Sequence, residues 1–137
     1  MALSNRINMR GGGEGSLNFD NVFNGTDGLN ENLSIIGGVI QGSPKYINLR
    51  TSDSSVSIIG IDFTDYRYMV VDAQTYSQSL QYRIHGVVNY TSFLSPGAGR
   101  VTVNIDISSV TGAQILEFCE AIQGAGYGYI YNITLSK

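Results

Sequence analysis

The most regular alternation of apolar and polar residues in the chain lies between Arg100 and Gly112. Its apolar members are Val101, Val103, Ile105 and Ile107. A period of two places these side chains on one face of a β-strand, so the segment predicts a strand with one face in a hydrophobic core. The hydroxyl and glycine residues of Ser108–Gly112 follow, and they predict a turn.

Comparable apolar segments recur at short intervals along the chain and predict an all-β protein. Residues that favour turns separate them, as in β-sandwiches and barrels. Strands are expected within 17–23, 33–40, 47–50, 56–59, 66–73, 79–89, 101–108 and 129–136. The core is expected to join the four aliphatic residues named above with Met69, Val71, Ile84, Ile133 and Leu135.

Two of these segments carry more specific predictions. The nearly continuous apolar run Tyr66–Ala73 predicts a central strand with both faces at least partly covered, and Ser79–Asn89 is expected to be its neighbour. The glycine pair Gly37 and Gly38 interrupts another apolar segment. That interruption predicts a bulge or a close approach between two backbones.

The last two segments differ in how clearly they indicate their structure. Ala113–Gln123 fits a helical stripe, with Thr111 and Gln114 resembling a capping box, and it also fits a strand. We favour the strand because the surrounding segments are all β. At the C-terminal end, an unbroken alternation predicts four inward side chains. These are Tyr129, Tyr131, Ile133 and Leu135.

The composition supports this fold class and narrows the range of partners. Of the 137 residues, 14% are charged, 17 are glycine, nine are tyrosine and none is tryptophan, which suits short strands joined by tight turns. The net charge of −3 gives no basic surface for phosphate backbones, so we expect no nucleic-acid partner. Cys119 is the single cysteine, which excludes an internal disulfide framework. No signal peptide or long apolar run is evident, so we expect synthesis in a cytoplasm and no membrane partner.

Residues 1–13 differ from the rest and are predicted to form an N-terminal arm with a glycine hinge, followed by one β-sandwich domain at 14–137. The arm carries two cations and no acid, whereas the remaining residues have a net charge of −5. We therefore expect the arm to dock on an acidic neighbour, mainly through apolar contacts. The residues expected to make this contact are Leu3, Arg6, Ile7, Met9 and Arg10. The alternative is an ordinary chain terminus.

Four short phrases of the sequence resemble a recurrent β-sandwich. They are Ile61–Tyr66 (IDFTDY), Val70–Ala73 (VVDA), Ile105–Gly112 (IDISSVTG) and Tyr129–Leu135 (YIYNITL). Over roughly residues 17–135, the chain resembles the jelly-roll modules of virion proteins from tailed phages of Gram-positive bacteria. Those modules are themselves similar to carbohydrate-binding modules. The resemblance implies two antiparallel sheets in jelly-roll order, a strand at 113–123 and no catalysis.

Two functions follow from this resemblance. The first is a non-enzymatic structural component of a phage particle, a capsid decoration or tail accessory protein displayed in many copies. It would bind other virion proteins, or itself, and would be located in the virion after synthesis in a bacterial host. The alternative is a carbohydrate-binding module that recognises a glycan of the bacterial cell surface.

Glycan binding requires exposed aromatic rings, because such modules stack the apolar face of a sugar on tryptophan or tyrosine. Since the chain has no tryptophan, tyrosines at expected strand ends or turns are the candidates for glycan contact. They are Tyr66, Tyr76, Tyr90 and Tyr127. The alternative is that these rings cap the core with the hydroxyl group in water.

The sequence predicts no catalytic residue, no metal site and no cofactor. His85 is the only histidine and lies in an alternating segment, and no cation near Cys119 in the sequence would activate its thiol. A glycosidase would need two carboxylates that converge in a cleft. The available pairs are Asp62 with Asp65 and Glu117 with Glu120, and in a strand the second pair points to opposite faces.

The acids around the first glycine-bearing loop are the best candidates for a calcium site. These acids are Asp20, Asp27 and Glu31. Their spacing matches no defined calcium loop, so we interpret them as acids that favour turns.

Overall fold

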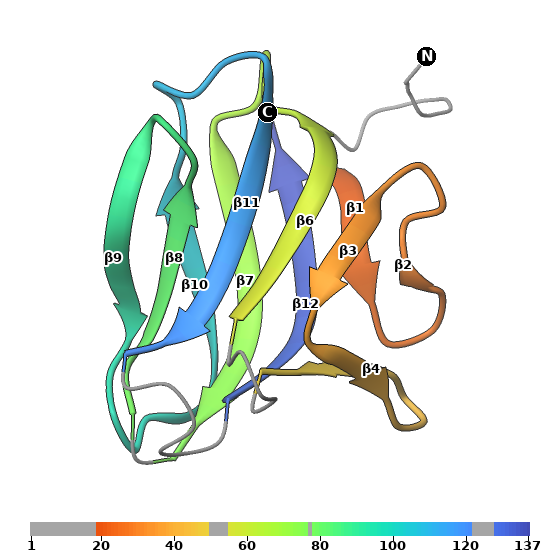
Figure 1. The fold of residues 1–137 in the computed structure, drawn as a ribbon, viewed down its shortest axis with the longest axis vertical. Helices are drawn as coiled ribbons and strands as arrows, with labels where there is room; N and C mark the ends of the chain where they lie inside the picture. The colour runs from red at the N-terminus through yellow and green to blue at the C-terminus, as the bar shows by residue number, and fades with distance from the viewer. Residues whose placement is uncertain (1–18, 50–54, 77, 122–127) are drawn as a thin grey trace.

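The computed structural model describes residues 19–49, 55–76, 78–121 and 128–137, and these form two antiparallel β-sheets (Figure 1). The regular elements of this part are all strands, which confirms the predicted all-β sandwich. The segment that fitted both helix and strand contains β11 (Ala113–Glu120), so the strand interpretation is confirmed. Within the same residues, no helix has the length and apolar character needed to cross a membrane. The predicted arm at 1–13 lies outside the described residues.

The larger sheet has seven strands among the described residues. In sequence order they are β1 (Phe19–Asn24), β2 (Gly28–Leu29), β4 (Val39–Gln41), β5 (Tyr46–Asn48), β7 (Tyr68–Thr75), β10 (Gly99–Asp106) and β12 (Gly128–Ser136). Their order across the sheet is β10-β7-β12-β1-β2, and β5 pairs with the first residues of β12 and with β4. The outer face of this sheet positions the candidate site described below.

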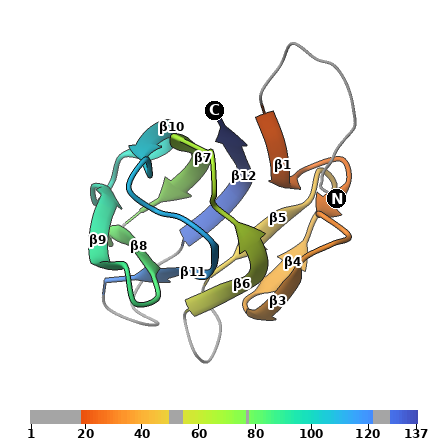
Figure 2. The same cartoon turned by 90° about the horizontal axis from the view of Figure 1, so that it is seen from above.

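The smaller sheet has the strand order β3-β6-β11-β8-β9. Its strands besides β11 are β3 (Ser34–Gly37), β6 (Ser55–Asp62), β8 (Leu80–Ile84) and β9 (Val88–Leu94). Figure 2 shows the two sheets as facing layers, with the core between them. The largest fully buried side chains come from both layers and from the connections, and they include Phe23, Ile47, Phe63, Met69, Leu116, Phe118 and Ile130. Burial of each such side chain contributes about 1.5–3 kcal/mol of hydrophobic free energy.

Strand β10 confirms most of the predicted alternation and corrects one end of it. Ile105 and Ile107 are 8% and 1% exposed, and Val103 packs partly buried against the core. Val101 is 37% exposed, so its predicted burial is wrong. The reason is its place in the sheet, since β10 is an edge strand and pairs with β7 on one side. The other predicted core residues are buried, namely Met69, Val71, Ile84, Ile133 and Leu135.

Strand β7 is central, as predicted, but its predicted neighbour is wrong. It lies between β10 and β12 in the larger sheet. The segment Ser79–Asn89 instead supplies β8 and the start of β9, which belong to the smaller sheet. Alternation shows which residues face the core, but it does not show which strands pair, so the connection between the sheets could not be predicted.

The glycine pair at the end of β3 carries the chain from the smaller sheet to β4 of the larger one. Gly37 and Gly38 both have positive φ, at 77° and 67°, a region that favours glycine. A side chain on Gly37 would collide with the backbone carbonyl of Ser55, and one on Gly38 would lie 2.8 Å from Val56. The predicted close approach between backbones is therefore confirmed.

Candidate functional site

Four tyrosine rings gather on the outer face of the larger sheet, and we call them the tyrosine platform. They are Tyr46, Tyr76, Tyr129 and Tyr131. Tyr129 contacts the other three, with ring centroids 5.1 Å from Tyr46, 6.3 Å from Tyr76 and 6.5 Å from Tyr131. Tyr76 is 51% exposed and the others are half-buried. Tilted and edge-to-face contacts of this kind are favourable for aromatic rings, so the cluster is a stable aromatic surface.

A β-bulge in β12 explains why two of these rings face outward. Ile130 and Asn132 pair with consecutive residues of β7, so Tyr131 is an extra residue between them. The extra residue reverses the phase of the alternation: Ile130 is buried, and Tyr129 and Tyr131 lie on the outer face. The prediction that Tyr129 and Tyr131 point inward is therefore wrong.

Gln74 of β7 holds two platform rings through its side-chain amide. The hydroxyl of Tyr131 donates a hydrogen bond to Oε1 of Gln74 at 2.6 Å, and Nε2 of Gln74 donates to the Tyr76 hydroxyl at 2.9 Å. Burial raises the pKa of Tyr131, so its hydroxyl remains a donor at neutral pH. Rings that are already ordered lose less entropy when a ligand binds.

Arg100 of β10 adds a cation to the platform. Its guanidinium carbon lies 3.8 Å from the centroid of the Tyr131 ring, within range of a cation–π interaction. Asp72 fixes this position, because Nε and Nη2 of Arg100 donate to its two carboxylate oxygens at 3.1 and 3.0 Å. Asn132 also donates to Asp72, at 3.3 Å. The hydrogen bond with Asp72 raises the pKa of Arg100, so the guanidinium keeps its charge.

A groove of about 530 Å³ lies beside the platform. This volume is within the range of about 300–1,000 Å³ that is usual for small-molecule sites. The groove is bounded by platform residues and by two turns, and its lining consists of Asn24, Gly25, Thr26, Ser43, Pro44, Lys45, Tyr46, Arg100, Tyr131 and Asn132. The lining combines aromatic rings with amides, hydroxyl groups and two cations.

The turns that form one wall of the groove are tied together. The side-chain oxygen of Asn24 accepts hydrogen bonds from the backbone N–H groups of Thr26 and Asp27, at 2.9 and 2.6 Å. The backbone N–H of Lys45 donates to the carbonyl of Gly25 at 2.9 Å. These bonds give both turns a defined geometry at the groove.

The structure brings one of the four predicted glycan-contact tyrosines into the platform. Tyr76 belongs to it, whereas Tyr66 lies in a separate hollow and Tyr90 lies on the smaller sheet. Tyr127 is outside the described residues. Glycan contact by these tyrosines remains a prediction, and the geometry favours Tyr76.

The sequence contained a signal for one of the platform residues that we missed. Ile47 and Leu49 alternate with Asn48 in the sequence and are both buried, and the same alternation places Tyr46 on the opposite face. No comparable signal marked Tyr129 and Tyr131, because in the sequence they form one unbroken alternation with Ile133 and Leu135, and the bulge that separates the two pairs leaves no mark in it.

Tyr90 belongs to an ionic cluster on the outer face of the smaller sheet. Its hydroxyl donates to Oε2 of Glu117 at 2.6 Å, while Nη2 of Arg83 and Nε2 of His85 both lie 2.7 Å from Oε1 of Glu117. The guanidinium of Arg83 stacks over the Tyr90 ring at 4.5 Å. The hydrogen bond to Glu117 raises the pKa of Tyr90 to about 12. These bonds connect the side chains of the cluster to one another, although Nε of Arg83 is buried without a hydrogen-bond partner among the described residues. The mutual bonding indicates a structural role.

Burial and hydrogen bonding have opposite effects on Glu117, which is 7% exposed. Burial alone raises the pKa of a carboxyl group. In Glu117, the hydrogen bonds from Tyr90, Arg83 and His85 together outweigh burial and lower the pKa below its usual value of 4.5. Glu117 is therefore an ionised carboxylate at neutral pH.

Among the residues that the structure describes, the other side chains that could take part in catalysis do not come together in a reactive site. Within the described residues, no three His, Cys, Asp or Glu side chains lie close enough to hold a metal ion. Asp62 accepts a hydrogen bond from the backbone of Thr64 at 2.9 Å, as in a turn. Cys119 is buried, and burial raises the pKa of its thiol to about 11, so it is a poor nucleophile at neutral pH.

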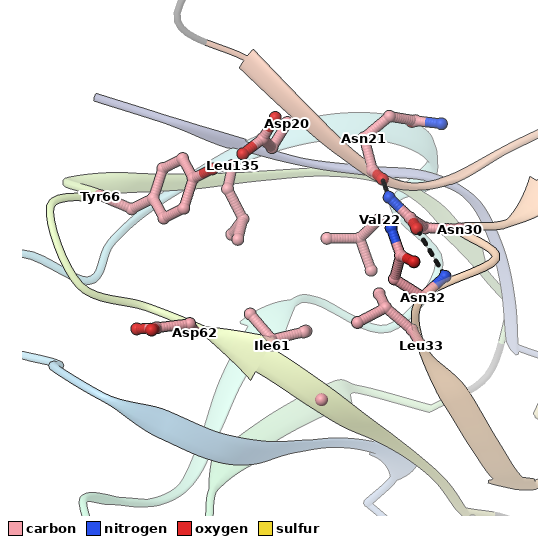
Figure 3. A pocket seen from close by; sticks show the side chains of 11 residues that line it. Asp20, Asn21, Val22, Asn30, Asn32, Leu33, Ile61, Asp62, Tyr66 and Leu135 are labelled. Atoms are coloured by element: carbon pink, nitrogen blue, oxygen red, sulfur yellow. Dashed lines mark hydrogen bonds between the residues drawn. The ribbon is translucent and has the colours of Figure 1, made fainter. Parts of the chain in front are cut away.

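Tyr66 lines a smaller hollow of about 150 Å³ between β1 and β6 (Figure 3). In Figure 3 the ring of Tyr66 lies toward Asp20 at one end, and Asn30 and Asn32 lie at the other. Asn30 donates to the carbonyl of Asn21 and accepts from the N–H of Asn32, both at 2.9 Å, so its amide supports the loop. Of the described residues that line the hollow, Tyr66 alone is aromatic, which gives it less stacking surface than the platform.

No protein-family model and no curated protein sequence matches the chain. Comparison with solved structures finds similar folds. A mutant of the family 29 carbohydrate-binding module CBM29-2, in complex with mannohexaose, aligns with a TM-score of 0.67 and 14% sequence identity, covering 88% of this chain and 92% of that chain. A second structure of a family 29 carbohydrate-binding module gives a TM-score of 0.67 and 15% identity, with 88% and 89% of the two chains covered.

A third similar structure belongs to an enzyme. It is a family two carbohydrate esterase from Cellvibrio japonicus, with a TM-score of 0.59, 14% identity, and coverage of 88% of this chain but 33% of the esterase. At these low identities the comparisons establish the fold. They confirm the jelly-roll β-sandwich that the sequence resemblance implies.

Proposed function

We propose that this chain is a carbohydrate-binding module, and that it binds a glycan on the tyrosine platform and in the groove beside it. The observation that carries the proposal is the gathering of four tyrosine rings and a stacked arginine on one open sheet face. The fold shared with carbohydrate-binding modules supports it.

The chemistry of this surface matches that of a sugar ring. A pyranose has apolar faces of C–H groups that stack on aromatic rings, and its hydroxyl groups need hydrogen-bond partners around the rim. Beside the platform, Asn48 donates to Gln41 at 2.8 Å, and the groove adds Asn24, Asn132 and Arg100. The platform therefore offers stacking at its centre and polar groups at its edge, as a glycan requires.

The proposed role is binding without catalysis. Among the described residues, the lining of the groove contains no histidine, cysteine or carboxylate, and the nearby carboxylate of Asp72 is engaged by Arg100. A glycosidase would need two carboxylates facing the scissile bond, and an esterase would need an activated nucleophile. The described lining supplies neither.

The place of the protein in a phage particle remains a prediction from the sequence. The fold shared with carbohydrate-binding modules favours the glycan-binding hypothesis over a purely structural virion role. The two functions are compatible, because a virion protein can also contact a glycan of the host surface. Mass spectrometry of purified particles would test the virion location, and deletion of residues 1–13 would test whether assembly needs the arm.

The experiment that tests the glycan-binding proposal is a survey of soluble polysaccharides followed by mutation of the platform. The full chain is run in gels that contain mannans, glucans or bacterial wall polysaccharides, and the best oligosaccharide is titrated by calorimetry. Tyr129→Ala should lower the affinity by about tenfold or more, because Tyr129 contacts the other three rings.

Tyr68→Ala is the matched control, since Tyr68 is 38% exposed and lies at the end of β7 that is far from Gln74 and the platform. It should leave the affinity unchanged. Two results would contradict the proposal: no polysaccharide in the survey binds, or a correctly folded Tyr129→Ala variant binds as tightly as the unmodified chain.

A further inference from the structure

The charges that line the groove are unusual for this chain. The sequence has eleven acidic and eight basic residues, giving a net charge of −3. The two charged side chains in the described lining of the groove, Lys45 and Arg100, are both cations. The described lining of the groove therefore presents two cations and no carboxylate, and the carboxylate that pairs with Arg100, Asp72, lies outside the lining.

Lys45 has no carboxylate partner within the described part of the chain. The ion pairs found there involve Arg83, His85 and Arg100 as the basic partners. The backbone of Lys45 is tied to Gly25, and its side chain runs along Gly28, where an added Cβ would lie 3.3 Å from Cδ and 3.7 Å from Nζ. This close passage limits where the ammonium group can lie.

Arg100 keeps one edge of its guanidinium open. Of its five N–H groups, one on Nε and one on Nη2 bind Asp72. Of the three that remain, one on Nη2 and one on Nη1 lie side by side on the adjacent edge, and 54% of the side-chain surface is exposed. Two parallel donors on a planar cation match the two oxygens of a carboxylate or phosphate.

From these observations we propose that the groove selects acidic glycans, in which a carboxylate or phosphate on the sugar binds Arg100 and Lys45 while the ring stacks on the platform. This inference rests on the proposed glycan-binding function. A neutral glycan would remove water from both cations without supplying a charge in return, whereas an acidic glycan replaces that water with charge-assisted hydrogen bonds.

The test compares oligosaccharides that differ in charge alone. Suitable pairs are oligogalacturonate with its methyl ester, hyaluronan oligosaccharide with its carboxyl-reduced form, and phosphomannan with mannan. Each pair is titrated against the full chain by calorimetry at low and high salt. In at least one pair, the acidic member should bind about tenfold or more tightly at low salt, and the difference should shrink at high salt.

Lys45→Gln and Arg100→Gln should each reduce this preference several-fold. Lys137→Gln removes an exposed cation outside the groove and should leave the preference unchanged. The carboxylate and phosphate pairs identify which anion is recognised, and either one supports the inference.

The inference and the proposed function fail in different ways. If neutral members bind as tightly as acidic ones, and Tyr129→Ala abolishes that binding, the function stands and the charge preference is wrong. If neither acidic nor neutral glycans bind, both are wrong. If the preference survives in Lys45→Gln and in Arg100→Gln, the anion is recognised elsewhere and the inference is wrong.

Discussion

A single inserted residue, Tyr131, brings two of the four platform rings to the outer face of the larger sheet. Because it is the extra residue of the β12 bulge, Tyr129 and Tyr131 lie on the same outer face instead of in the core. Its hydroxyl binds Gln74 and its ring carries Arg100. One backbone irregularity thus positions both the stacking surface and the cation of the proposed site.

Glu117 provides a prediction at the residue scale that does not depend on the proposed function. Three hydrogen bonds lower its pKa, so its ionised form stabilises the fold above the usual carboxyl pKa of 4.5. That stabilisation is lost as the pH falls through the lowered value. Glu117→Gln should therefore lower the free energy of unfolding by about 1–3 kcal/mol at pH 7.

Thermal unfolding from pH 7 into the acid range checks this prediction. The difference in Tm between the two proteins should be constant near neutral pH and should shrink below pH 4.5, the usual value for glutamate. A difference that persists unchanged into strong acid would mean that the charge of Glu117 is not what stabilises the cluster.

At the scale of elements, the alternation of apolar residues predicted the strands and most of the core. The pattern in β10 correctly placed Ile105 and Ile107, and the β-rich surroundings correctly favoured a strand for β11. The sequence could not predict the partner of β7 or the bulge in β12, because both depend on pairing between distant segments. For the same reason the sequence did not indicate that Tyr129 and Tyr131 belong to the platform. Tyr76 was predicted, and the alternation around Tyr46 could have identified that ring as well.

Strand β10 allows a test of how burial changes the cost of a charged substitution within one strand. Ile105 and Val101 point toward the same face, but Ile105 is 8% exposed and Val101 is 37% exposed. Ile105→Asp should cost about 3 kcal/mol or more, because it buries an unpaired charge. Val101→Asp should cost less than about 1 kcal/mol, since its carboxylate can reach water. If urea denaturation shows that both variants lose the same free energy of unfolding, the edge of this sheet is covered.

The pair Gly37 and Gly38, where the chain passes from one sheet to the other, gives a second test at this scale. Gly37 and Gly86 have nearly the same φ, 77° and 76°, but a Cβ on Gly37 would meet the Ser55 carbonyl and one on Gly86 would meet nothing within 4 Å. Gly86→Ala should cost about 1–2 kcal/mol from backbone strain alone. Gly37→Ala should cost clearly more in the same denaturation experiment. Similar costs would show that the crossing has room for a side chain.

At the scale of the whole molecule, the two outer faces of the sandwich carry different side chains. The smaller sheet carries the Glu117 cluster, in which Arg83, His85 and Tyr90 all bind the Glu117 carboxylate. The larger sheet carries tyrosine rings and cations beside an open groove. We therefore propose that the smaller sheet contributes stability through this cluster and that the larger sheet binds the ligand.

The measurement that tests this assignment most directly is a nuclear magnetic resonance titration of the full chain with the best glycan from the survey. We expect the shifted backbone amides to cluster around Tyr46, Gln74, Arg100 and Tyr129, on β5, β7, β10 and β12. Shifts concentrated around Arg83 and Glu117 on the smaller sheet, or around Tyr66 in the hollow of Figure 3, would contradict the account.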